Sequence, residues 1–295
     1  MKKKAFIYGC AQLGIQIAWH ISEDYDFLGF IDTDPRKHTA NGGGYINIDG
    51  KNYTVYHPDI LKNMQFDKIF IGSEVDIYIK QIKNILFNYG IKENSIDMSL
   101  TFIPYYARLN FIKLLSLEFE NKKIKGSVAE LGVFRGETAK EINKFFKNDV
   151  FYLLDTFEGF DIRDCKNEKE QGLSKANIGD FSNTSLDYVK SKMLYVDNCR
   201  FVKGYFPETS NQIPNKEVFK FVNIDVDLYQ PILAGLEFFY PRMVDEGVIL
   251  IHDYFHPYYT GSKKAVDEFC LKYNLEFFPI GDAFSVTLIK NKKSA

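Results

Sequence analysis

The N-terminal third of the chain alternates short apolar runs with amphipathic segments. Apolar runs that predict buried strands lie at residues 5–8, 27–31 and 68–71, and helical periodicity lies at residues 13–21 and 77–89. The first run passes through Gly9 and Gly14 into its helix, and the second run ends at Asp32. A strand, a glycine turn, a helix and a strand that ends in an acid are typical of the start of a dinucleotide-binding unit.

The glycine turn lacks its middle glycine, because Ala11 stands at that position. Two interpretations follow. Either a nucleotide binds here, or the segment is a Rossmann-like scaffold with a role in substrate binding or assembly, and we favour the scaffold. The polar stretch at residues 92–104 contains the best boundary. The sequence thus predicts a Rossmann-like domain over residues 1–100 and a second domain over residues 101–295.

The remainder of the chain repeats this alternation on a larger scale, after a helix predicted at residues 105–119. Strands are predicted at residues 127–130, 150–154, 200–203, 219–224 and 247–251, a helix at residues 262–273, and two late strands at residues 276–280 and 284–289. Five strand–helix units closed by an antiparallel pair predict a doubly wound α/β fold with a seven-stranded mixed sheet.

The first of these strands ends in a motif of the form E-x-G-x-x-x-G. It contains Glu130, Gly132 and Gly136, and Thr138 follows in the predicted helix. Glycines allow the backbone to approach a ligand closely, and the start of the helix offers amide donors to a carboxylate. The motif resembles the first motif of class I methyltransferases, which implies that these four residues contact S-adenosylmethionine. A turn of this kind also serves other nucleotides.

The next two strands end in further candidates for that ligand. Asp155 follows the second strand, about twenty residues beyond Gly132, where an acid can accept both ribose hydroxyls. The alternative is that Asp155 only caps the turn after it. Gly204 and Tyr205 follow the third strand and are expected beside the adenine.

Acids and a histidine follow the fourth and fifth strands. Asp225 and Asp227 are two residues apart, so on an extended chain they project to the same side, and His252 and Asp253 follow the neighbouring strand. Close carboxylates repel each other unless a cation or a proton lies between them. Such oxygens, with one imidazole, suit Mg²⁺ or Mn²⁺. The alternative is that the acids cap turns and His252 is a hydrogen-bonded core residue.

The second domain resembles the macrocin O-methyltransferase family, which methylates sugar hydroxyls on antibiotics and related glycosides. The resemblance rests on VAELGVFRGETA (128–139), LLDTFEGF (153–160), GYFPET (204–209), NIDVDLY (223–229) and IHDY (251–254). It implies that Asp225 is a metal ligand and Asp227 the general base. The family has two adjacent acids as further ligands, so Asp253 carries over, whereas His252 departs from the pattern.

The N-terminal segment resembles a small domain of some bacterial polysaccharide-biosynthesis proteins, through IYGCAQLG (7–14) and GFIDTDP (29–35). Together the resemblances imply an S-adenosylmethionine- and Mg²⁺-dependent methyltransferase acting on a sugar, or a nucleotide-activated sugar, for a surface polysaccharide. The alternatives are a sugar on a small secondary metabolite and a non-catalytic nucleotide-binding scaffold. The polar segment 161–184 is expected to be a mobile lid, and the aromatic run 254–259 an acceptor wall or core.

Charge, cysteine spacing and the length of apolar runs indicate which kinds of partner and location to expect. The net charge is −2, from 37 Lys and Arg against 39 Asp and Glu, so no overall field attracts nucleic acid or an anionic membrane. The four cysteines lie far apart, which indicates reduced thiols and a cytoplasmic location. No apolar run is long enough to cross a bilayer. A homodimer is left open.

Overall fold

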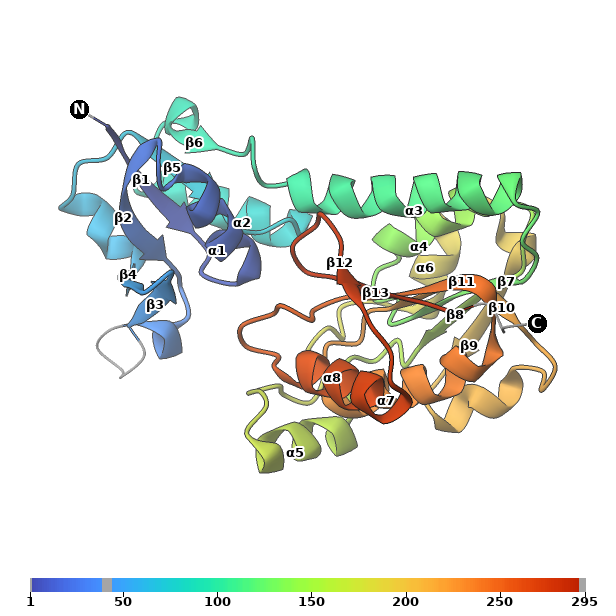
Figure 1. Ribbon diagram of the computed structural model, residues 1–295. Coiled ribbons are helices and arrows are strands. Elements are labelled where there is room, and N and C mark those ends of the chain that lie inside the picture. The colour runs from blue at the N-terminus through green and yellow to red at the C-terminus, as the bar shows by residue number, and fades with distance from the viewer. Residues whose placement is uncertain (1, 39–43, 292–295) are drawn as a thin grey trace. The chain divides into compact units, whose positions relative to one another are not determined.

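The chain divides into two compact units. The computed structural model describes residues 2–38 and 44–291 (Figure 1). One unit covers Met1–Tyr106 and the other Ala107–Ala295, so the division falls within helix α3 (Ile103–Asn121). We predicted the boundary six residues earlier, in the polar stretch that precedes this helix. That the two units are independent domains stays a prediction.

The first unit contains a six-stranded sheet with the order β3-β4-β2-β1-β5-β6. Its strands are β1 (Lys3–Tyr8), β2 (Tyr25–Ile31), β3 (Tyr45–Ile48), β4 (Lys51–Tyr56), β5 (Lys68–Ile71) and β6 (Ile96–Asp97), and its helices are α1 (Gln12–Ile21) and α2 (Asp76–Asn88). All neighbouring strands are parallel except β3 and β4. The predicted central strands and both helices are confirmed. We did not predict the edge strands β3 and β6 or the neighbouring β4, because none of them has a continuous apolar run.

The glycines of the first unit serve close packing between helix and strand. A β-carbon on Gly14 would lie 2.1 Å from the carbonyl oxygen of Gly9, so only glycine allows α1 to start so near β1. The middle glycine of a dinucleotide fingerprint is the one that lets the backbone approach a pyrophosphate, and Ala11 stands there as the residue preceding α1. The two glycines that are present therefore explain the fold without a ligand.

The second unit contains a seven-stranded sheet with the order β12-β13-β11-β10-β7-β8-β9. Its strands are β7 (Ser127–Leu131), β8 (Phe151–Asp155), β9 (Cys199–Lys203), β10 (Phe219–Ile224), β11 (Met243–Ile251), β12 (Phe278–Pro279) and β13 (Val286–Ile289). Strand β13 is antiparallel to both of its neighbours, and the other pairs are parallel. The predicted seven-stranded mixed sheet is confirmed, with a shorter closing pair than expected.

Helices cover both faces of this sheet (Figure 1). The helices after α3 are α4 (Glu137–Phe145), α5 (Ile162–Gln171), α6 (Leu186–Lys192), α7 (Tyr229–Phe239) and α8 (Gly261–Tyr273). Apolar residues of α7 and α8, such as Leu236 and Phe269, share one buried cluster with the sheet. Residues of α3, α4 and α6, such as Ile112, Ile142 and Val189, share the other. Polar groups inside these layers must therefore be paired or functional.

The described residues contain neither a membrane-spanning helix nor a disulfide-bonded pair of cysteines. Among the described residues, no helix is long and apolar enough to cross a membrane. All four cysteines are buried free thiols, among them Cys165 on α5.

Helix α5 lies within the segment that we expected to be a mobile lid, and its first turn is capped by Asp161, which accepts a hydrogen bond from the amide of Arg163.

The first unit should fold without the second, because it has its own buried cluster, with Phe6 and Ile69 fully enclosed. Residues 1–106 expressed alone should show a single cooperative thermal transition by circular dichroism. In that fragment, Phe6→Ala should cost about 3–5 kcal/mol and abolish the transition. A wild-type fragment that melts without cooperativity would contradict two independent domains.

Candidate active site

The loop after β7, residues 132–136 and here termed the donor loop, lies directly against the chain that follows β10. A β-carbon on Gly132 would stand 1.9 Å from the carbonyl oxygen of Asp225, and the φ of Gly132 is 91°. The close approach and the positive φ each exclude any residue other than glycine at position 132. We expected Gly132 to admit a ligand. The structure shows that it admits the backbone of a second candidate residue, so the two halves of the site are in contact.

The donor loop ends at the start of α4. Gly136 precedes the helix with a φ of 77°, and no side chain caps the first turn, in which Thr138 lies. Amides at such a helix start are donors for an anionic ligand group. Contact of Gly136 and Thr138 with the carboxylate of S-adenosylmethionine stays a prediction.

The carboxylate of Asp155 holds the donor loop in place. One oxygen accepts hydrogen bonds from the amides of Val133 (2.7 Å) and Phe134 (2.8 Å), and the other accepts from the amide of Phe157 (2.6 Å). The turn-capping role that we left open for Asp155 is thus present. The role as ribose acceptor stays a prediction, since the carboxylate in this conformation already bonds to the backbone.

Glu130 lies in a buried polar layer between the donor loop and the end of β10. It is 1% exposed, and its Oε1 accepts a hydrogen bond from Nδ2 of Asn223 at 2.8 Å. Burial above all, together with the nearby charge of Asp225, raises the pKa of Glu130 well above its ordinary value, although the Asn223 hydrogen bond opposes this. A contact with the methyl donor stays a prediction.

Gly204 and Tyr205 follow β9. The amide of Gly204 donates to the carbonyl of Asp155 at 2.9 Å, and the hydroxyl of Tyr205 donates to Oδ1 of Asp164 on α5 at 2.9 Å. The guanidinium of Arg163 lies 3.6 Å from the centre of the Tyr205 ring. Tyr205 therefore anchors α5 beside the site, and its contact with adenine stays a prediction.

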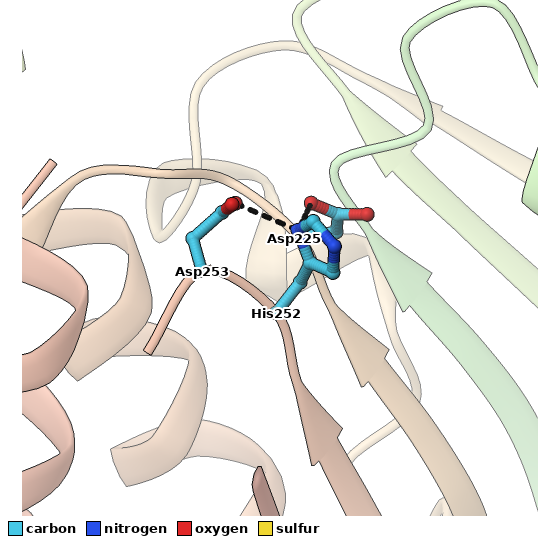
Figure 2. Close-up of side chains that lie close together, drawn as sticks. All are labelled: Asp225, His252 and Asp253. Atoms are coloured by element: carbon cyan, nitrogen blue, oxygen red, sulfur yellow. Dashed lines mark ion pairs between the residues drawn. The ribbon is translucent and has the colours of Figure 1, made fainter. Parts of the chain in front are cut away.

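The side chains of Asp225, His252 and Asp253 converge from the ends of β10 and β11 (Figure 2). Nδ1 of His252 lies 3.1 Å from Oδ1 of Asp225 and 2.9 Å from Oδ2 of Asp253. One potential ligand atom from each residue lies within 4.8 Å of the others. The backbone brings them together, because the amide of His252 donates to the carbonyl of Ile224 at 2.9 Å, which continues the pairing of the two strands.

The cluster is not satisfied by hydrogen bonds. Both ring nitrogens of His252 and Oδ2 of Asp253 are buried. Among the described residues, no group meets hydrogen-bond geometry with any of these three atoms. Nδ1 nevertheless forms ion pairs with both acids, so the metal-ligand role of His252 and its alternative as a core histidine both stay predictions. Burial lowers the pKa of His252, but Asp225 and Asp253 outweigh it, so the pKa lies well above its ordinary value. Positive charge is favoured at this position.

Asp227 lies in a turn and not on the strand from which we predicted its direction. Strand β10 ends at Ile224, and Asp227 has a φ of 58°, while its carbonyl accepts a hydrogen bond from the hydroxyl of Ser262 at 2.9 Å. Its side chain still joins the cluster. Burial, and then the negative charges of Asp253 and Asp225, raise the pKa of Asp227 well above its ordinary value.

Two residues near the cluster were missed by sequence reasoning. Arg108 on α3 is 5% exposed, and its Nη1 lies 3.8 Å from Oδ2 of Asp225. Its spacing of four from the buried Ile112 was the available signal for an arginine on an inward face. Glu168 on α5 is buried and accepts a hydrogen bond from the amide of Tyr229 at 2.8 Å, at the start of α7. No apolar periodicity identifies it, because the buried residues of α5 are Asp164, Cys165 and Glu168, and two of these three are acids.

The aromatic run at residues 254–259 contains a core residue, Tyr254, and a residue close to the site, Tyr259. Tyr254 is buried, and its hydroxyl donates to Oδ1 of Asp267 at 2.7 Å, so it is core. The ring of Tyr259 packs against Phe160 at 6.1 Å, and after burial the charge of Asp227 is the largest cause of its raised pKa. Tyr259 therefore lies near Asp227, and His256 of the same run lies near enough to Asp253 to lower its pKa.

The strand order, with one antiparallel strand inserted beside β11, defines a class I methyltransferase fold. The O-methyltransferase NovP shares this fold with a TM-score of 0.52 and 22% identity, over 63% of this chain and 80% of NovP. The calicheamicin methyltransferase CalS11 gives a TM-score of 0.51 and 16% identity, over 78% of this chain and 88% of CalS11. No curated protein sequence matches the chain.

Residues 81–280 match the macrocin-O-methyltransferase (TylF) family. This range covers well over half of the sequence and includes the donor loop and the whole Asp225–His252–Asp253 cluster. The chain belongs to this family and is an S-adenosylmethionine-dependent O-methyltransferase.

Asp155→Asn should weaken S-adenosylmethionine binding, because an amide cannot accept on both sides and the donor loop loses a charged acceptor. The expected loss is about 1.5–3 kcal/mol, measured by titration calorimetry. The exposed Asp187 on α6 provides a matched control, since Asp187→Asn should bind normally. Unchanged affinity in Asp155→Asn would remove this residue from the donor site.

Asp164→Asn should change how stability depends on pH. Burial raises the pKa of Asp164 from 3.8 to about 6, so the stability that its proton contributes is full below the lower value and is lost as pH rises through the upper. Asparagine still accepts from Tyr205 and carries no charge. The melting temperature of Asp164→Asn relative to wild type should therefore rise between about pH 4 and pH 7. A constant difference across that range would show that Asp164 is not protonated in the fold.

Proposed function

We propose that the protein transfers a methyl group from S-adenosylmethionine to a hydroxyl of a sugar, with a divalent cation held by Asp225, His252 and Asp253. The observation that carries this proposal is the convergence of three ligand atoms within 4.8 Å beside Asp227, at the same sheet edge as the donor loop. The three residues belong to the segment that matches the family.

The residues fit a divalent cation in spacing and in chemistry. Adjacent ligands of an octahedral ion, at metal–ligand distances of about 2.1 Å, lie about 3 Å apart. Nδ1 of His252 lies 3.1 Å and 2.9 Å from the carboxylate oxygens of Asp225 and Asp253. Of these atoms, Nδ1 of His252 and Oδ2 of Asp253 are buried without a partner in hydrogen-bond geometry, which is a cost that a cation would offset.

The roles of the residues follow from charge. When bound, the two cofactors supply the methyl group and the Lewis acidity that makes a sugar hydroxyl easier to deprotonate. Burial and the charges of Asp253 and Asp225 raise the pKa of Asp227, and positive charge in the cluster would lower it, so that Asp227 could act as the base that accepts the proton of the acceptor hydroxyl. Asp155 holds the donor loop, so the donor and the acceptor meet in a fixed arrangement.

The acceptor class is supported by two observations. The family is named for the methylation of macrocin, and CalS11 is a calicheamicin methyltransferase. Tyr259 lies near Asp227, and its ring continues through Phe160, at 6.1 Å, to Phe181, at 5.1 Å from Phe160; aromatic side chains of this kind suit the apolar face of a sugar ring.

Two sources of that sugar are candidates. A nucleotide-activated sugar for a bacterial surface polysaccharide is supported by the Rossmann-like first unit, and we place it first. A sugar on a small secondary metabolite is supported by the family name. Transfer of a labelled methyl group to a panel of nucleotide sugars and to glycosylated macrolides, with and without EDTA, separates the two. Transfer to neither class of sugar would refute a sugar acceptor, and transfer unaffected by EDTA would refute the cation.

Asp225→Asn and Asp227→Asn should fail in different ways. Asp225→Asn removes a charged ligand, so excess divalent cation should recover part of the activity. Asp227→Asn should leave cation and donor binding nearly intact and lower turnover about 10²- to 10⁴-fold, the usual share of a general base. Steady-state kinetics across a cation titration measure both effects.

Asp245→Asn, an exposed acid on β11, is the matched control and should retain wild-type kinetics. Recovery of the Asp227 variant by cation, without recovery of the Asp225 variant, would mean that the two roles are reversed. Full activity in both variants would remove the catalytic role from this end of β10.

A further inference from the structure

We infer that His252 makes the cation site selective for a transition-series divalent ion, of which Mn²⁺ is the representative, over Mg²⁺. The inference rests on the proposed function, because it concerns the cation that Asp225 and Asp253 would bind. It assigns to His252 a role as a nitrogen ligand and as the residue that determines which metal the enzyme uses.

The position of the imidazole is fixed by packing and not by hydrogen bonds. The ring of His252 stacks on Phe284, with ring centres 5.2 Å apart and planes 15° apart. This contact holds Nδ1 between the carboxylates of Asp225 and Asp253 (Figure 2). A ring oriented by an aromatic neighbour is a preorganised ligand, because little rotamer freedom remains to be lost on binding.

The unsatisfied nitrogen distinguishes a ligand from a structural histidine. Buried ring nitrogens normally form hydrogen bonds, and among the described residues no group meets hydrogen-bond geometry with those of His252, although Nδ1 forms ion pairs with two acids. The nearest oxygens belong to the same two acids that would bind the cation. A cation at this point converts three close but poorly oriented polar groups into three ligands.

The donor set favours one class of ion. Mg²⁺ prefers oxygen ligands and retains several waters, whereas imidazole is a ligand of transition-series ions, among which Mn²⁺ binds most weakly and also accepts carboxylate oxygens. Arg108 adds to this preference, because its Nη1 lies 3.8 Å from Oδ2 of Asp225 and offsets part of the negative charge. The positive charge of Arg108 should therefore lower the affinity of Mg²⁺, which is held mainly by the carboxylate charges, more than the affinity of Mn²⁺, which also bonds to the imidazole nitrogen.

The test measures binding, apart from catalysis. Mn²⁺ should bind the full chain, and its electron spin-echo modulation should contain a ¹⁴N coupling from a directly bound imidazole, which changes when histidine is labelled with ¹⁵N. His252→Asp should abolish the coupling and lower the ratio of Mn²⁺ to Mg²⁺ affinity at least about tenfold, as titration calorimetry and competition measure. His20→Asp, at an exposed position of α1, should change neither.

The outcomes separate the inference from the proposed function. If neither ion binds and EDTA does not affect methyl transfer, the proposed cation site fails. If Mn²⁺ binds without a ¹⁴N coupling, or if His252→Asp leaves the affinity ratio unchanged, the cation site stands and the role of His252 is overturned. If His252→Asp does not fold, the ¹⁴N measurement on the wild-type chain alone decides the matter.

Discussion

The contact between the donor loop and the chain after β10 is the constraint on which the site depends. Gly132 and the carbonyl of Asp225 approach so closely that no side chain fits between them. The amide of Asp225 also donates to the carbonyl of Leu131 at 2.8 Å, so the two strand ends are joined by backbone bonds. The register of the sheet thereby holds the donor loop and the Asp225–His252–Asp253 cluster side by side, and the two halves of the proposed site are joined through the backbone.

Much of this arrangement could be predicted, because it follows from local patterns. Continuous apolar runs identified the central strands of both sheets, and the residue at the end of each strand identified most of the candidate site. Strands β3 and β4 were not predicted, because most of their residues are exposed or half-buried and they contain no such run. Helix α5 escaped because its buried residues include Asp164 and Glu168, which hydrophobic periodicity cannot reveal.

The partners of side chains could not be predicted from spacing. Alternation along a strand suggested the direction of Asp227, but the strand ends three residues earlier and the residue lies in a left-handed turn. Asp155 stands where a ribose acceptor is expected and bonds to the donor loop as well. Arg108 comes from a helix far away in the chain. Each of these depends on tertiary contacts that no local pattern encodes.

The hydrogen bond from the amide of Tyr229 to Glu168 has a consequence for engineering. Leu228, which precedes α7, provides no side-chain cap. The acceptor for the first turn of α7 comes instead from Glu168 on α5, 61 positions earlier in the chain. The segment around α5 is thus not an interchangeable surface insertion. A graft that replaces this segment must bring its own acceptor to the Tyr229 amide, because otherwise the helix that begins two residues after Asp227 loses the acceptor of its first turn.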